Sequence, residues 1–272
     1  MGVSDFCGGC PGAAPETGII SQSSGPANAG NVAIDAGKLT ITAMGAIGSV
    51  VVGSGSGDAG KVSVNVSGQL AIDAGVATIP SDQRPLDDCC TAINQSLDQF
   101  RSGIIAESMT GSGNAGTVTV NAGTLSLSNE GQIIANTFGA GQAGEISVNV
   151  VGPAVLDNGY IMANSIGGTG NAGRVSISAP TLSVVDGGAI WAAAAFGFGT
   201  GGDISVEIPG QLTIDGGITG FASVMAWTLA NHGGGGLVNV HAGDLSIVGG
   251  GLITRPDLRL RIRRRWNHDR QR

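Results

Sequence analysis

Hydrophobic and polar residues alternate with a period of two along most of the chain, and this pattern predicts β-strands rather than helices. One clear stretch contains three such runs, TVTVNA at 117–122, LSL at 125–127 and IIA at 133–135. Gly or Asn bounds the runs, and both residues tolerate the positive φ of tight turns. We therefore predict three short strands, each with one apolar face.

The three runs recur together as a repeat. Full or degraded copies begin at Asn28, Asp58, Asn114, Gln142, Asn171, Gly201 and Gly235. They lie about 29 residues apart, except for the longer interval between Asp58 and Asn114, which we interpret as one coil with an insertion. A half-copy starts at Thr17. No single copy can bury its apolar faces, so stacked copies are expected to share one interior.

Stacked copies predict an all-β fold, a single-stranded right-handed parallel β-helix (solenoid) of about 7–8 coils of ~29 residues with three short strands each. Right-handed winding follows the general preference of connections between parallel strands. Equivalent positions in successive copies form two apolar columns that should point inward. The first contains Val118, Ile146, Val175, Ile204 and Val238, and the second contains Ile133, Ile161 and Ile190.

Two segments depart from the repeat. Residues 1–254 are expected to form the solenoid, with an insertion loop at about 76–102 and a basic tail at 255–272. The insertion has helical spacing at Ile93, Leu97 and Phe100, and a short helix there would either bind a partner or decorate the coil. The tail could bind a membrane or nucleic acid by its charge, or pair as a last strand, but its abrupt start favours a non-native or disordered segment.

Composition narrows the class of protein. The chain has 49 glycines, 12% charged and 42% hydrophobic residues, which excludes a disordered chain, and the glycines lack the triplet period of collagen. Up to Thr254 it carries 5 basic against 18 acidic residues, which argues against nucleic acid as a partner. No apolar run is long enough for a membrane helix, and the N-terminus does not resemble a signal peptide. We expect a piece of a longer exported protein.

The coil starts Asn-Ala-Gly or Asp-Ala-Gly, the Val-x-Val-x-Ala and Leu-x-Leu strands and the Gly-x-Ile-Ile-Ala closing segments carry a family resemblance. From Thr17 to about Thr254 the chain resembles the haemagglutinin-repeat region of filamentous-haemagglutinin-like exoproteins, the adhesins of two-partner secretion systems. The resemblance implies a secreted protein at the cell surface, associated with the outer membrane and exported by an outer-membrane transporter. The implied partners are host or neighbouring cell surfaces, glycans or matrix.

A column of carboxylates is the most suggestive candidate for chemistry. Asp73, Asp157, Asp186 and Asp215 are expected at one turn position, with Asn129 in the same column. Carboxylates stacked roughly 5 Å apart would shift one another's pKa, recruit a metal ion such as calcium, or perform acid/base catalysis in a polysaccharide lyase or hydrolase. The alternative, which we favour, is that Asp is simply a good turn residue.

A second column is apolar and should point outward, because neighbouring residues of a strand face opposite sides. Its members are Ile20, Ile105, Ile134, Met162, Trp191 and Ile253. A solvent-facing stripe of this kind could be an adhesive contact surface. The alternatives are that the strand bends at a corner or that the insertion lies over the stripe.

The remaining reactive residues form no convincing site. Possible disulfides involve Cys7, Cys10, Cys89 and Cys90, whose pairing stays open and whose spacing is not a zinc pattern. His232 and His241 assemble no catalytic triad with serine, and His241 is expected at the outward position of Asn121 and Asp35. We predict no catalytic or cofactor-binding residues and no cofactor.

The patterns together favour a structural or adhesive shaft segment of a secreted or cell-surface bacterial exoprotein, which attaches through the surface of its β-helix. The alternative is a carbohydrate-active β-helix enzyme that uses the Asp column. A third hypothesis is a surface scaffold without a specific receptor.

Overall fold

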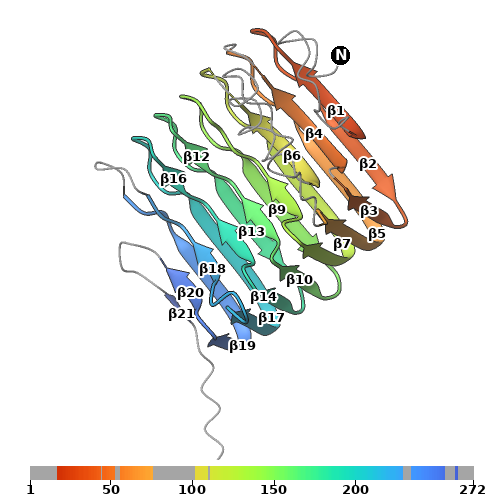
Figure 1. Ribbon diagram of the computed structural model, residues 1–272, viewed down its shortest axis with the longest axis vertical. Coiled ribbons are helices and arrows are strands. Elements are labelled where there is room, and N and C mark those ends of the chain that lie inside the picture. Colours follow the sequence, from red (N-terminus) through yellow and green to blue (C-terminus); the bar gives the residue numbers. More distant parts are fainter. Residues whose placement is uncertain are drawn as a thin grey trace, which may run out of the picture.

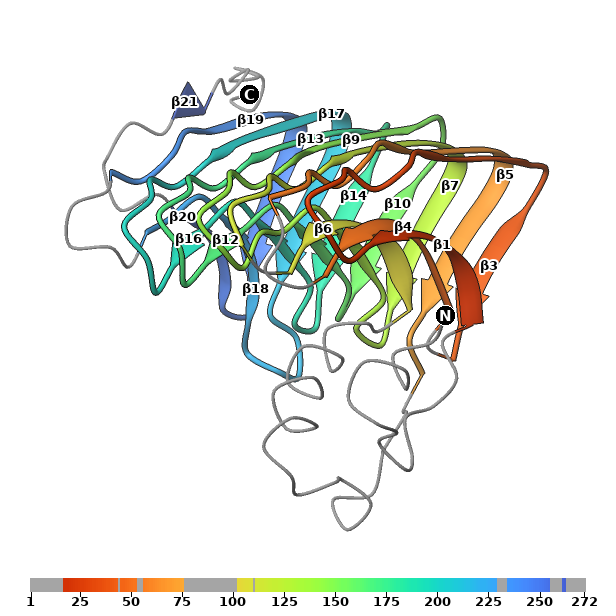
Figure 2. The same cartoon turned by 90° about the horizontal axis from the view of Figure 1, so that it is seen from above.

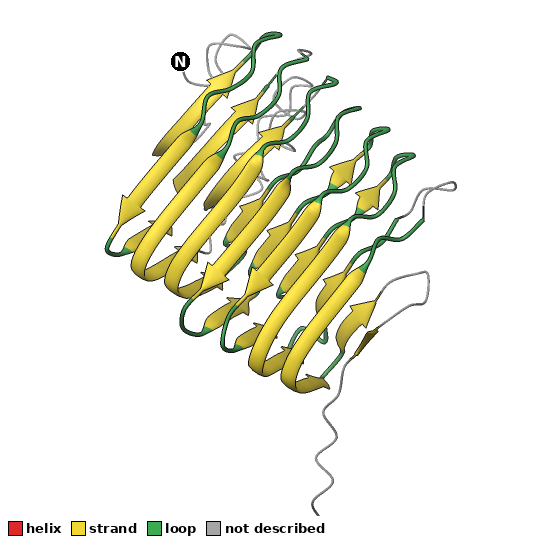
Figure 3. Ribbon diagram, turned by 180° about the vertical axis from the view of Figure 1, so that it is seen from behind, coloured by secondary structure: helices red, strands yellow, loops and turns green. Residues whose placement is uncertain are grey.

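The computed structural model describes residues 17–43, 45–52, 56–75, 102–109, 111–228, 234–254 and 261–262. These residues form an all-β solenoid of about 7 coils with a spacing of about 29 residues, and they contain no helix (Figure 1). Figure 3 shows the same coils as strands joined by turns. Because no helix occurs among these residues, none is long and apolar enough to cross a membrane.

The described strands of the solenoid lie in two main sheets, and within each sheet the described strands pair in parallel. Sheet A contains eight strands: β1 (Thr17–Ser23), β4 (Gly45–Val51), β6 (Gly103–Ser108), β8 (Gln132–Ile134), β11 (Tyr160–Met162), β15 (Ala189–Trp191), β18 (Ala222–Met225) and β20 (Gly251–Thr254). They stack in this order from one end of the molecule to the other (Figure 2).

Sheet B holds the first two strand segments of each coil. Its eleven strands are β2 (Val32–Ala36), β3 (Leu39–Thr42), β5 (Val62–Asp73), β7 (Thr117–Ser128), β9 (Glu145–Val150), β10 (Ala154–Asp157), β13 (Arg174–Ser178), β14 (Leu182–Val185), β17 (Asp203–Asp215), β19 (Val238–Val248) and β21 (Arg261–Ile262). A separate pair, β12 (Ser165–Ile166) and β16 (Ala194–Ala195), lies at the corner beyond sheet A.

The expected three strands per coil are present, with one difference. In β5, β7, β17 and β19 the first two segments join into one long strand, and the pairing register shifts between Val66 and Gln69 and between Ile208 and Gln211. Such an irregularity interrupts the hydrogen-bond ladder locally and lets the strand bend. A single strand therefore forms two walls of the solenoid in these coils.

Both predicted inward columns are confirmed. Val118, Ile146, Val175, Ile204 and Val238 pair in sequence across β7, β9, β13, β17 and β19, and all are at most 1% exposed. Ile133, Ile161 and Ile190 pair in the same way in sheet A and are fully buried. Burying one such aliphatic side chain stabilises a fold by about 1.5–3 kcal/mol, so the columns supply the main stabilisation of the stack.

The glycine of each Asn-Ala-Gly coil start is required by the close stacking of the coils. A Cβ on Gly116 would overlap the carbonyl oxygen of Gly60, and a Cβ on Gly144 would overlap that of Gly116. Gly173 and Gly202 continue the same column. Because the obstructing atoms belong to the backbone, no side-chain movement can make room. The repeat motif thus reflects backbone packing between coils.

The first residue of each coil start forms a ladder of hydrogen bonds to the next coil. Asn114 Oδ1 accepts from the Gln142 amide at 2.8 Å, and Asn171 Oδ1 accepts from the Thr200 amide at 2.9 Å. Asn28, Asp58 and Gln142 do the same. The side chain satisfies a backbone donor at a turn, where no strand partner is available.

Several predictions concern residues outside the described ranges: the four cysteines, His232, the insertion at 76–101 and most of the tail. Within the tail, β21 is described and pairs with β19 at Asn239 and Val240. The possibility that the tail pairs as a last strand is therefore confirmed for Arg261 and Ile262 alone.

Candidate contact surface on the outer face of sheet A

The predicted apolar stripe is a real column on the side of sheet A that faces away from the interior. In β6 the side chains of Ile104 and Ala106 belong to the main core, whereas Ile105 between them belongs to a separate cluster. The column runs Ile20, Gly48, Ile105, Ile134, Met162, Trp191, Met225 and Thr254. Ile253 was assigned wrongly, because it pairs with Val224 and packs against the main core.

The stripe was predicted to face solvent, but Ile105 and Ile134 in its N-terminal half are buried. Ile105 is 0% exposed and Ile134 is 1% exposed. They form a second apolar cluster with Ala46, Val50 and Met109. The neighbouring positions on this face are apolar in these coils, so the stripe is wide enough to act as a small outer core.

Glu107 is a buried acid on this same outer face, and sequence reasoning missed it. It pairs with Val50 across β4 and β6 and is fully buried. Among the described residues, neither carboxylate oxygen accepts a well-formed hydrogen bond, although the side-chain amide of Asn136 acts to lower the pKa. Burial dominates and raises the pKa to about 8. The only signal in the sequence was a Glu where the next two coils have Asn136 and Asn164.

The C-terminal half of the stripe remains partly open to solvent. Met162, Trp191 and Met225 are half-buried and pair in sequence across β11, β15 and β18. The Trp191 indole Nε1 donates a hydrogen bond to Ser223 Oγ at 2.8 Å. The Phe221 ring meets the indole edge-on, with ring centroids 6.5 Å apart and an interplanar angle of 69°. These contacts fix the orientation of both aromatic rings.

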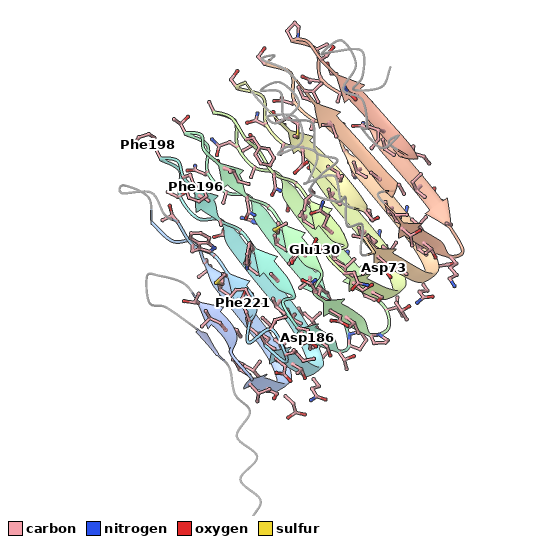
Figure 4. The ribbon with its side chains drawn as sticks, in the orientation of Figure 1. Asp73, Glu130, Asp186, Phe196, Phe198 and Phe221 are labelled. Atoms are coloured by element: carbon pink, nitrogen blue, oxygen red, sulfur yellow. The ribbon has the colours of Figure 1, made fainter. Side chains whose placement is uncertain are left out.

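The loop before β18 holds Phe221 in place (Figure 4). Asp186 Oδ1 accepts from the Ile218 amide at 2.7 Å, and Asp215 Oδ1 accepts from the Gly217 amide at 2.9 Å. Thr219 Oγ1 donates to the Gly216 carbonyl at 2.9 Å. The loop is therefore built from its own hydrogen bonds, and it presents Phe221 with 38% of its surface exposed.

The predicted carboxylate column is interrupted. Asp73 pairs with Ser128, which pairs with Asp157. Asp157 in turn pairs with Val185, and Val185 pairs with Asp215. No two of Asp73, Asp157 and Asp215 are therefore paired in adjacent coils, whereas the Asp186 amide donates to the Asp215 carbonyl of the next coil. Among the described residues, no group of three or more His, Cys, Asp or Glu could hold a metal ion.

Asp186 and Asn129 belong to a different column, one residue further into the turn. Asn129, Asn158 and Asp186 have left-handed φ values of 49°, 50° and 48°. Asn and Asp are the non-glycine residues that adopt this conformation most readily. Hydrogen bonds from Asn129 Nδ2 and the Gly75 amide also hold the pKa of Asp73 below its usual value. The carboxylates of Asp73, Asp186 and Asp215 thus accept hydrogen bonds from turn residues.

The outer face of sheet B carries a polar ladder. Asn65, Asn121 and Asn149 each donate through Nδ2 to the preceding rung, beginning with Asp35 as acceptor. The ladder borders a shallow groove of about 670 Å³. The same column continues through Ser178 to Glu207 and His241. The exposed side chains of these last two residues meet with 2.8 Å between His241 Nδ1 and Glu207 Oε1. The predicted outward position of His241 is confirmed.

The fold and this surface define the class of the protein: a parallel β-solenoid with a small outer core and an aromatic platform on one sheet, formed by the half-buried Trp191 and the exposed Phe221. Comparison of the chain with protein-family models, with curated proteins and with solved structures gave no match.

Proposed function

We propose that the chain is a structural and adhesive shaft segment of a secreted or cell-surface bacterial exoprotein. The observation that carries the proposal is the run of half-buried Met162, Trp191 and Met225 on the outer sheet face, with the exposed Phe221 beside Trp191. Large apolar side chains gathered at the surface of a soluble domain mark interaction sites. The coils beneath them form one continuous core, which makes a stiff support for such a surface.

The resemblance to filamentous-haemagglutinin-like exoproteins supports the rest of the proposal. Export through an outer-membrane transporter and display at the cell surface would place the solenoid where it meets host or neighbouring cells, glycans or matrix. The alternative, a carbohydrate-active enzyme, depended on adjacent carboxylates. The register separates Asp73, Asp157 and Asp215 by Ser128 and Val185, so these three residues do not supply the adjacent carboxylates that the alternative requires.

The test is attachment of beads that carry the purified chain to bacterial cells, animal cells, immobilised glycans and matrix proteins. The key variant replaces Met162, Trp191 and Met225 with Gln. The matched control replaces Ser147, Ser176 and Ser205 with Gln, since these residues lie in the same three coils on the outer face of sheet B. We expect attachment by the parent and the control and its loss in the key variant. Attachment by the parent no greater than by albumin-coated beads would refute the proposal.

A further inference from the structure

We propose that Trp191 and Phe221 form a stacking site for a pyranose ring of an uncharged glycan. This site belongs to the adhesive surface proposed above, so it rests on that function and specifies its ligand. Pyranose rings present a face of C–H groups that packs on the negative face of an aromatic ring, while their hydroxyls seek hydrogen-bond acceptors. The platform offers both kinds of group.

The two aromatic rings are held in position before any ligand arrives. Ser223, which accepts the indole N–H of Trp191 at 2.8 Å, is itself fully buried and cannot move away. The edge-on contact with Phe221 restrains the indole from a second side. A ligand that stacks on these rings therefore loses little affinity to ordering of the protein.

The loop that carries Phe221 is an addition to the repeat. Ile190 lies 34 residues before its partner Val224, whereas Ile161 lies 29 residues before its partner Ile190. The extra residues form the loop anchored by Asp186, Asp215 and Thr219. The Gly187 amide also donates to the Phe221 carbonyl at 2.7 Å, which ties the loop to the preceding coil. Insertions of this kind in repeat proteins often carry binding.

The charges around the loop select the class of ligand. Asp186 and Asp215 each use Oδ1 for a loop amide, and a carboxylate has about four acceptor positions. They are therefore suited to accept hydrogen bonds from sugar hydroxyls. They would repel uronic, sialic or sulfated sugars, and they would lose hydration against a lipid surface. An uncharged sugar satisfies both the rings and the carboxylates.

The test is a titration of the full chain with neutral oligosaccharides of glucose, galactose, mannose and N-acetylglucosamine and, separately, with sialylated and sulfated oligosaccharides. Binding is followed by calorimetry and by the NMR signal of the Trp191 indole N–H. We expect at least one of them to bind and to shift this signal. Trp191→Ala and Phe221→Ala should each weaken binding about tenfold or more, and Trp191→Phe should retain part of it. Phe198→Ala is the matched control, because Phe198 is 69% exposed but follows β16 at the other end of the sheet A strands (Figure 4).

Three results would overturn the inference: no response to any neutral sugar, a response to anionic sugars alone, or equal loss of binding in Phe198→Ala. If beads still attach to cells through Trp191 while no sugar binds, the adhesive function stands and the ligand is a protein or lipid. If neither attachment nor sugar binding occurs, both proposals fail. Circular dichroism of each variant separates these results from a folding defect.

Discussion

The two halves of the outer face of sheet A share one backbone register but differ in exposure. In the N-terminal half, Ile105 and Ile134 lie in a closed apolar cluster with the buried Glu107 on the same face. In the C-terminal half, Met162 and Trp191 continue the same column but are only half-buried. The column position alone therefore does not determine whether a residue belongs to a core or to a surface.

The difference lies in the neighbouring columns. Ile105 and Ile134 have Ala46, Val50 and Met109 around them, so apolar side chains enclose them from several sides. Trp191 lies beside the small Ser223 instead, and its other aromatic contact is an edge-on one with Phe221 from an added loop. A flat sheet face becomes a core where apolar columns adjoin and a platform where they do not.

The variants with the largest expected effect test whether the coils stack equally closely in the two halves. Gly116→Ala and Gly202→Ala change one glycine column beneath the N-terminal and the C-terminal half, respectively. Each added Cβ would overlap a backbone carbonyl of the preceding coil, so we expect each variant to lose about 3 kcal/mol or more of its free energy of unfolding. Urea denaturation followed by circular dichroism measures this. A large loss in one variant alone would show that the halves stack differently.

Glu107 should give the N-terminal half a pH dependence that the C-terminal half lacks. Its pKa is about 8 in the folded chain and near the ordinary value of 4.5 in the unfolded chain, so the folded state retains the proton over this range. The free energy of unfolding should therefore fall as pH rises from about 4.5 to about 8, by up to about 5 kcal/mol. Glu107→Gln should remove this dependence. Parallel stability curves for the two proteins between pH 5 and pH 9 would disprove it.

Shortening one side chain to alanine in each half should cost more stability at a buried position than at a half-buried one. Ile134→Ala should cost about 3 kcal/mol because it leaves a cavity in the outer cluster, whereas Met162→Ala should cost about 1 kcal/mol. These two residues are direct neighbours in the column, so they form a matched pair. Thermal denaturation monitored by circular dichroism gives both values. Equal costs would mean that the outer cluster extends through both halves.

The smallest effect concerns the exposed ladder at the coil starts. Asn114→Ala and Asn171→Ala each remove one side-chain hydrogen bond to the next coil, at 2.8 and 2.9 Å. We expect a loss of about 1 kcal/mol in each variant, since the backbone amide left behind can reach water. Hydrogen exchange at the amides of Gln142 and Thr200 should report the same change locally. No acceleration at either amide would show that these bonds are not formed in solution.

Much of the fold could be predicted from the sequence because its determinants are local and repeated. The alternation around Val118 and Val120 fixed the inward face, and equivalent residues in later copies identified their partners. The carboxylate column could not be predicted, because its placement depended on which residue ends each strand. Asp157 ends β10, whereas Asp186 lies one residue beyond β14. A shift of one residue changes the column to which a side chain belongs.

The sequence by itself determined the class of fold, the coil length and the residues of the inner columns, since a period of two and a repeat near 29 residues leave few other ways to bury the apolar positions. The tertiary structure alone decided which part of the outer stripe is closed and which is open. It also showed that Glu107 is buried without a well-formed partner and that a loop brings Phe221 against Trp191. These properties depend on residues that are distant in the sequence, and only stacking brings them together.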